Sequence, residues 1–160
     1  MTPTDLPTQA TLHHLLIREG FTSGAEVVAW ADGWILRLDS WSEELTDISL
    51  SGGNGGKILS ALGRLALPTL SQQAFGHLCG LLLARLEADA GELSAVNSLL
   101  WRVHYDGFHG VRPLEFEPTV GLCWFHEWEN LIPDCLQDMT PDELRREVTD
   151  FLRFYAPPAS

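Results

Sequence analysis

The densest group of side chains capable of chemistry lies beyond the middle of the chain. His104, Asp106 and His109 fall within six residues, and Glu115 and Glu117 follow closely. Two imidazoles and a carboxylate are the ligands of facial iron sites, so a metal site is one interpretation. The spacing matches no metal-binding motif, and a further ligand would have to come from elsewhere in the chain. We therefore expect a polar loop without metal or cofactor. The alternative is an enzyme, or a small-ligand- or metal-binding protein, that uses this region.

Two further segments contain part of a catalytic motif and lack the rest. His126 precedes a glutamate, as in the zinc motif HExxH, but Asn130 stands where the second histidine is required. The glycine-rich run 51–56 precedes Lys57, but Ile58 replaces the serine or threonine of a phosphate-binding P-loop. The sequence predicts no catalytic residue in either segment.

The cysteines indicate neither a disulfide framework nor a zinc site. There are three, Cys79, Cys123 and Cys135, and no two of them have CxxC spacing. Cys79 and Cys123 stand in apolar runs, where a thiol usually serves as a small buried hydrophobe. No basic segment followed by an apolar run opens the sequence, and the apolar stretch 78–84 is far shorter than the ~20 residues of a membrane helix. We expect a cytoplasmic protein that contacts no membrane.

Net charge is the most unusual bulk property of the chain. Ten basic and 22 acidic residues give −12, distributed as −6 over residues 1–54, +1 over 55–113 and −7 over 114–160. Such a balance repels phosphate backbones, so we expect no direct binding to nucleic acid. The same balance favours a protein partner with a basic surface.

One tryptophan stands in a polar connection, apart from the apolar stripes that hold the others. Trp41 is followed by Glu43, Glu44 and Asp47, and tryptophan is over-represented at binding hot spots. We predict that these four residues bind the basic partner. The alternative is that Trp41 folds back onto the preceding helix.

Helical patterns with clear start and stop signals cover most of the sequence. Capping boxes, in which Ser or Thr and the Glu or Gln three residues later satisfy free backbone N–H groups, are predicted at Ser23, Thr69 and Thr140. The chain length favours a single domain over 1–160. Helices are expected at 8–19, 23–38, 57–67, 70–89, 92–105, 119–132 and 140–155.

The remaining segments are predicted to be connections. These are residues 39–56, with a flexible loop at 51–56, an irregular stretch at 106–118 with a short strand or hairpin near 111–117, and loose ends at 1–7 and 156–160. In the helix at 119–132, Val120, Trp124, Trp128 and Leu131 share the face expected to be buried, which turns His126 and Asn130 to solvent.

Together these patterns predict a compact all-α bundle of six to seven helices. The function that fits best is that of a small acidic interaction protein, of the immunity or adaptor type, without catalysis.

Overall fold

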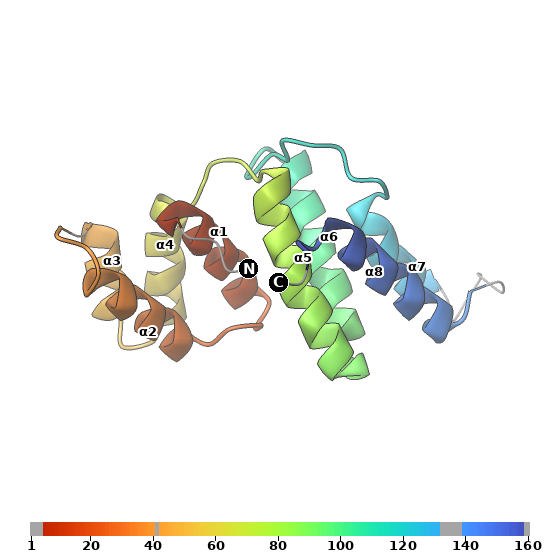
Figure 1. Ribbon diagram of the computed structural model, residues 1–160, viewed down its shortest axis with the longest axis horizontal. Coiled ribbons are helices and arrows are strands. Elements are labelled where there is room, and N and C mark those ends of the chain that lie inside the picture. Colours follow the sequence, from red (N-terminus) through yellow and green to blue (C-terminus); the bar gives the residue numbers. More distant parts are fainter. Residues whose placement is uncertain (1–4, 41, 132–138, 159–160) are drawn as a thin grey trace. The chain divides into compact units, whose positions relative to one another are not determined.

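The computed structural model describes residues 5–40, 42–131 and 139–158, and this part of the chain forms helices and loops only (Figure 1). The predicted all-α class is confirmed, and the described residues form eight α-helices where six to seven were expected. The helices are α1 (Leu6–Arg18), α2 (Gly24–Ile35), α3 (Glu43–Ser49), α4 (Gly55–Leu65), α5 (Gln72–Ala88), α6 (Leu93–Phe108), α7 (Leu122–Leu131) and α8 (Pro141–Tyr155), and the short 3₁₀ helix η1 (Ala90–Glu92) joins α5 to α6.

Contacts within the chain divide it into two compact units. Residues 3–67 carry α1 to α4 and are called the N-terminal unit. Residues 68–160 carry α5 to α8 and are called the C-terminal unit. The acidic residues are shared unequally, because the C-terminal unit has fourteen acidic and six basic side chains, a net charge of −8.

Two of the three predicted capping boxes are present. The hydroxyls of Ser23 and Thr140 each accept a hydrogen bond from the backbone N–H of the glutamate three residues later, and that carboxylate accepts one in return. The prediction for Thr69 is wrong. Ser71 caps α5 instead, accepting from Ala74 N at 3.2 Å. Thr69 turns its hydroxyl to the Glu115 carboxylate, a partner that local spacing cannot reveal.

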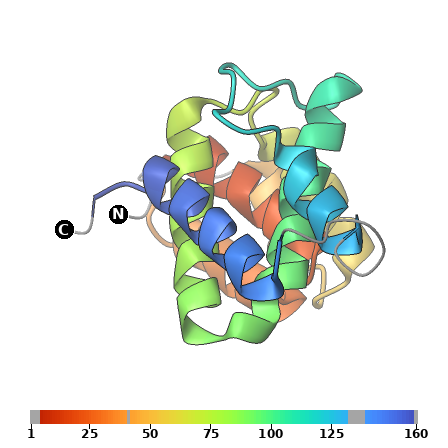
Figure 2. The same ribbon diagram turned by 90° about the vertical axis from the view of Figure 1, so that its right-hand side faces the viewer.

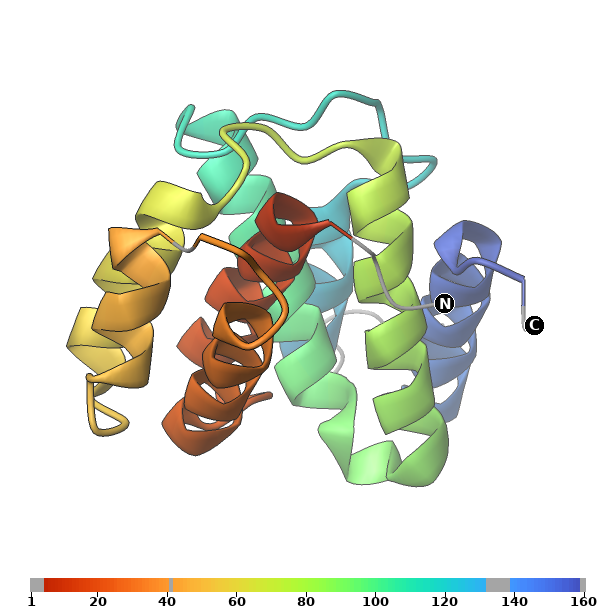
Figure 3. The ribbon, with the colours of Figure 1, turned by 60° about the vertical axis from the view of Figure 1, so that its left-hand side comes forward.

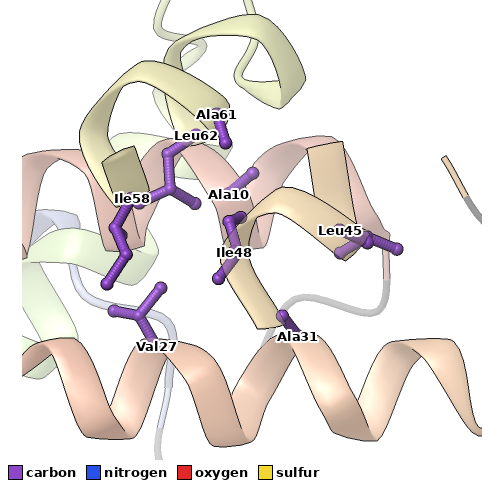
Figure 4. Close-up of a cluster of buried hydrophobic side chains, with 8 residues drawn as sticks. All are labelled: Ala10, Val27, Ala31, Leu45, Ile48, Ile58, Ala61 and Leu62. Atoms are coloured by element: carbon purple, nitrogen blue, oxygen red, sulfur yellow. The ribbon is translucent and has the colours of Figure 1, made fainter. Parts of the chain in front are cut away.

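An aliphatic core holds the N-terminal unit together. α1 packs on α4, and α3 lies against both α2 and α4 (Figure 3). Figure 4 shows the side chains that meet between these helices. Trp30 and Trp34 are half-buried at the margin, where Gln9 Oε1 accepts hydrogen bonds from both indole N–H groups, at 2.7 and 3.0 Å. The fully buried members of this core are Ala10, Val27, Ala31, Leu45, Ile48, Ile58, Ala61 and Leu62.

Helix α3 overturns the prediction that residues 39–56 are a non-helical connection. Ser42 is its N-cap and accepts a hydrogen bond from Leu45 N at 3.4 Å. Leu45 and Ile48 then point into the core at i, i+3 spacing. A helix of seven residues shows too little periodicity to be recognised without its partners.

The glycine-rich run 51–56 is a tight turn followed directly by α4. Gly52 and Gly53 have φ of 62° and 80°, a left-handed conformation that glycine adopts at no steric cost. Gly55 and Gly56 already belong to α4, which Asn54 caps. At the first position of α2, a Cβ on Gly24 would stand 2.6 Å from the carbonyl oxygen of Gly53, so the turn lies directly against that helix start.

Aromatic rings fill much of the core of the C-terminal unit. α8 packs on α5 and α7 packs on α6, as Figure 2 shows from one side. The buried ring of Phe75 on α5 has its centroid 5.1 Å from Phe116, 6.2 Å from Phe151 and 5.2 Å from Tyr155. A Cβ on Gly76 would lie 2.7 Å from the Tyr155 carbonyl oxygen, so this glycine lets α8 approach α5 closely.

Helices α1 and α6 end in the same backbone motif. After α1, Gly20 (φ 76°) donates to Ile17 O and Phe21 N donates to Leu16 O at 2.9 Å. After α6, Gly110 (φ 70°) donates to Gly107 O, and Val111 N donates to Asp106 O at 2.8 Å. Both ends are Schellman motifs, in which the N–H groups of a left-handed glycine and of the residue after it donate to the last carbonyls of the helix.

The expectation of a short strand near 111–117 reduces to a single parallel β-bridge between Leu70 and Leu114. Leu70 N donates to Pro113 O at 2.9 Å and Glu115 N donates to Leu70 O at 3.0 Å. Among the described residues these two bonds make no strand. At the chain start, α1 begins at Leu6, so residues 6–7 are ordered in a helix where loose chain was expected.

The buried face of α7 differs from the predicted one. Among its described side chains, Leu122 and Phe125 are buried, whereas Trp124 is 51% exposed. The side chain of Leu131 lies outside the described part of the structure. His126 is half-buried with its ring centroid 5.9 Å from that of Trp101 on α6, so it does not point to solvent as expected. The tryptophans misled the assignment because their large apolar area outweighed the smaller residues that face the core.

Candidate functional site

The predicted acidic site on α3 is partly neutralised within the chain. Arg64 on α4 places Nη2 2.6 Å from Asp47 Oδ2 and Nε 3.6 Å from Glu44 Oε1. Hydrogen bonds from its own backbone N–H and from the Ser42 hydroxyl, with Arg64 adding to them, lower the pKa of Glu44. Glu43 is exposed at the start of the helix. Trp41, the predicted anchor of this site, lies outside the described residues.

A groove of about 610 Å³ opens beside this acidic site, between α3 and α4. Lys57 and Arg64 bring positive charge to it, and Asp47 opposes them. Because Arg64 is already paired with two carboxylates of the same unit, the groove shows no strong preference for an anion. Its lining is Asp47, Leu50, Asn54, Gly56, Lys57, Ser60 and Arg64.

Residues 104–108 of the histidine-rich segment are helical and His109 is the C-cap, which corrects the predicted polar loop. α6 continues to Phe108 because Gly107 does not break it. The chain leaves the helix at Gly110, which has the positive φ. Helical geometry turns His104 away from Asp106, because residues two positions apart lie on opposite sides of a helix. Asp106 is buried at 4% exposure, while the two imidazoles lie against aromatic rings. These three side chains therefore do not gather into one site.

The described residues form neither a cluster of metal ligands nor a helix that could span a membrane. Within 5–40, 42–131 and 139–158, no three His, Cys, Asp or Glu side chains are grouped closely enough to hold a metal ion. In the same part of the chain, none of the helices combines the length and the apolar character needed to cross a membrane.

The two described cysteines do not have the environment of nucleophiles. Burial raises the pKa of the Cys79 thiol far above its ordinary value. Burial, and then the nearby charge of Glu127, raise the pKa of Cys123. A raised pKa keeps sulfur in the unreactive thiol form at neutral pH. Cys135 lies outside the described residues.

The C-terminal end of α6 carries a run of aromatic and apolar side chains that sequence reasoning did not single out. Their rings form a connected series, with centroid distances of 5.2 Å from Trp101 to Tyr105, 4.1 Å from Tyr105 to His109 and 5.2 Å from Phe108 to His109. Tyr105 is 40% exposed, Phe108 78% and Val111 63%. We call these five residues, Trp101, Tyr105, Phe108, His109 and Val111, the α6 aromatic surface.

The register between α6 and α7 explains why this surface is uncovered. Asn97 Nδ2 donates to Glu129 Oε2 at 2.8 Å, and Trp101 meets His126 one turn later. The two helices run antiparallel in this pairing, so α7 reaches its first residue, Leu122, near the level of Tyr105. The last turn of α6 projects beyond α7, and its large side chains face solvent.

The sequence already contained a signal for this surface, which is the four-residue spacing of Trp101, Tyr105 and His109. Positions i, i+4 and i+8 fall on one side of a helix, and Phe108 at i+7 joins them. The signal was missed because the helix was expected to stop at residue 105.

Comparison with known proteins gives no match. No family model, curated protein or solved structure is significantly similar to this chain.

Proposed function

We propose that this chain binds a protein partner that has a basic surface, and that the α6 aromatic surface makes the main contact. The observation that carries the proposal is the exposure of Tyr105, Phe108 and Val111 together at one helix end. Exposed apolar side chains grouped at one place mark interaction sites more often than single ones do. The unit that carries them has a net charge of −8, which favours a basic partner.

Rings and carboxylates have different parts in this proposal. Aromatic side chains lose little conformational entropy on binding and anchor interfaces, so the α6 aromatic surface governs dissociation. Exposed carboxylates contribute about 0–1 kcal/mol each to affinity, yet their field speeds encounter with a basic partner. Glu43, Glu44 and Asp47 belong to this second group. An anchoring role for Trp41 stays a prediction.

Capture of binding proteins with matched surface variants tests the main contact. The wild-type chain and the double variant Phe108→Ser/Val111→Ser are immobilised in equal amounts and exposed to the same cell lysate. Phe154→Ser is the control, because Phe154 is an equally exposed ring on α8, at 68%. We expect a basic protein that wild type and control retain and the double variant loses by about tenfold or more, as for a hot spot. Equal loss in the control, or retention of acidic proteins only, would contradict the proposal.

Association kinetics with the captured partner test the role of the α3 carboxylates. The triple variant Glu43→Gln/Glu44→Gln/Asp47→Asn should slow association and flatten its salt dependence, while dissociation stays the same. The effect should be modest, about two- to threefold, because Arg64 already neutralises part of the charge. A faster dissociation would instead place α3 inside the contact surface.

A further inference from the structure

We propose that the partner supplies arginine side chains to the α6 aromatic surface, and that Arg102 occupies part of this binding position in the free protein. The inference rests on the proposed function and deepens it by naming the chemistry of the contact.

The chain itself shows that these rings accept a guanidinium group. The Cζ atom of Arg102 lies 5.5 Å from the centroid of the Trp101 ring and 5.9 Å from that of Tyr105. Both distances fall within the ~6 Å over which a ring quadrupole attracts a cation. Trp101 and Tyr105 are stacked at an interplanar angle of 28°, so a single guanidinium group lies within reach of both rings.

Further along the helix, the same surface has a ring whose exposure leaves room for a second cation. Phe108 is 78% exposed, with the His104 ring nearly parallel to it at 6.3 Å and the His109 ring edge-on at 5.2 Å. These two rings flank the exposed phenyl group. An aromatic side chain has few rotatable bonds, so it loses little conformational entropy when a partner side chain stacks on it.

Carboxylates without competing basic residues lie next along the chain. Between residues 113 and 131 there are four glutamates and no lysine or arginine. Glu117 and Glu127 are exposed, so both are open to a guanidinium group of the partner. A planar guanidinium stacks on aromatic rings and pairs with carboxylates in bidentate fashion, and it is less strongly hydrated than an ammonium. The surface should therefore prefer arginine to lysine.

Arg102 then acts against the partner. Its charge repels an approaching guanidinium, and its contact with Trp101 and Tyr105 must be given up before another cation can take those ring faces. Replacing Arg102 by a neutral residue should strengthen binding of an arginine-rich segment. Mere loss of one positive charge has a smaller effect, because it acts only through the general field.

Charge-matched peptides provide the test. Nona-arginine and nona-lysine are titrated separately into the full chain, and binding is followed by NMR signals of the indole and aromatic ring protons. We expect nona-arginine to bind about fivefold more tightly and to shift the Trp101, Tyr105 and Phe108 signals. Phe108→Ser, a change at an exposed side chain, should remove most of this preference and leave the fold intact.

A pair of charge-matched variants tests the role of Arg102. Arg102→Gln should bind nona-arginine about threefold more tightly than Arg146→Gln, which removes the same charge from an exposed position on α8. Circular dichroism confirms that both variants are folded. Equal affinities of the two variants, or equal binding of the two peptides, would overturn this inference while leaving binding to a basic partner in place. Binding of neither peptide at low salt would contradict the proposed function itself.

Discussion

The C-terminal ends of α1 and α6 have the same backbone motif, but they differ in whether the residue after the glycine is buried. Phe21 after α1 is buried, at 5% exposure, whereas Val111 after α6 is 63% exposed. In a Schellman motif this residue commonly makes an apolar contact with the residue five positions earlier. That earlier residue is Leu16 in α1 and Asp106 in α6, so only the first end has an apolar side chain there.

The contrast separates apolar side chains that stabilise the fold from those that do not. The backbone hydrogen bonds that end α6 are complete without any contact from Val111. Neither Val111 nor the neighbouring Phe108 is therefore explained by the stability of the helix end. Apolar side chains that the fold leaves in water, grouped in one place, are the ones to assign to binding.

Replacing the residue after the glycine should give the largest difference in stability loss between the two helix ends. Phe21→Ala removes a buried ring and should lower the free energy of unfolding by about 3–5 kcal/mol. Val111→Ala should change it by less than about 0.5 kcal/mol, as for an exposed position. Urea denaturation followed by tryptophan fluorescence measures both. A cost of more than about 1 kcal/mol for Val111→Ala would show that this side chain packs in the fold, and the proposed contact surface would lose one of its members.

Replacing the glycine itself should cost similar stability at the two helix ends. Gly20→Ala and Gly110→Ala each place a Cβ on a residue with left-handed backbone, at a cost of roughly 1–2 kcal/mol. In both cases the added carbon meets no described atom within 4 Å, so the cost is conformational only. The two variants should therefore lose similar stability in the same denaturation assay. A much larger loss for one of them would mean that the two ends are not equivalent backbone motifs.

A smaller and pH-dependent effect is expected from α1 alone. Burial lowers the pKa of His13 from its ordinary value of 6.5, with Glu26 acting in the opposite direction. The ring lies 4.7 Å from that of Trp30, and its Nδ1 has no hydrogen-bond partner among the described residues. The unfolded chain takes up a proton at higher pH than the folded chain, so stability should fall as pH drops below about 6.5.

Thermal unfolding at a series of pH values between 8 and about 5 measures this effect. The variant His13→Asn should show a flatter dependence than wild type over that range. His104→Asn is the matched control, since His104 lies near the exposed end of α6. An unchanged slope in His13→Asn would assign the pH dependence to other groups.

Local chemistry explains which parts of the fold were predictable. Ser23 and Thr140 reveal their helices because the capping partner is only three residues away. The buried positions of α8, such as Leu144 and Val148, repeat at helical spacing, so the helix at 140–155 was predictable. Thr69 was misassigned because its hydroxyl bonds Glu115, 46 positions along the chain. The sequence shows no signal for such a distant partner.

The candidate site was less predictable, for a related reason. The sequence shows that Glu43, Glu44 and Asp47 form an acidic group. Only the structure shows that Arg64 forms ion pairs with Glu44 and Asp47. Likewise, the length of α6 decides whether Tyr105 and Phe108 belong to a loop or to a helix face. That length depends on which of two nearby glycines, at 107 and 110, has the positive φ.

Two other glycines show how unevenly this chain tolerates change. Gly24 and Gly55 each occupy the first position of a helix, after the N-caps Ser23 and Asn54. A methyl group at position 55 meets empty space, while one at position 24 would collide with the carbonyl oxygen of Gly53. A saturation library should therefore accept many residues at position 55 and almost none at position 24. Over evolutionary time, position 24 can diversify only in lineages where the turn at 51–54 has changed as well.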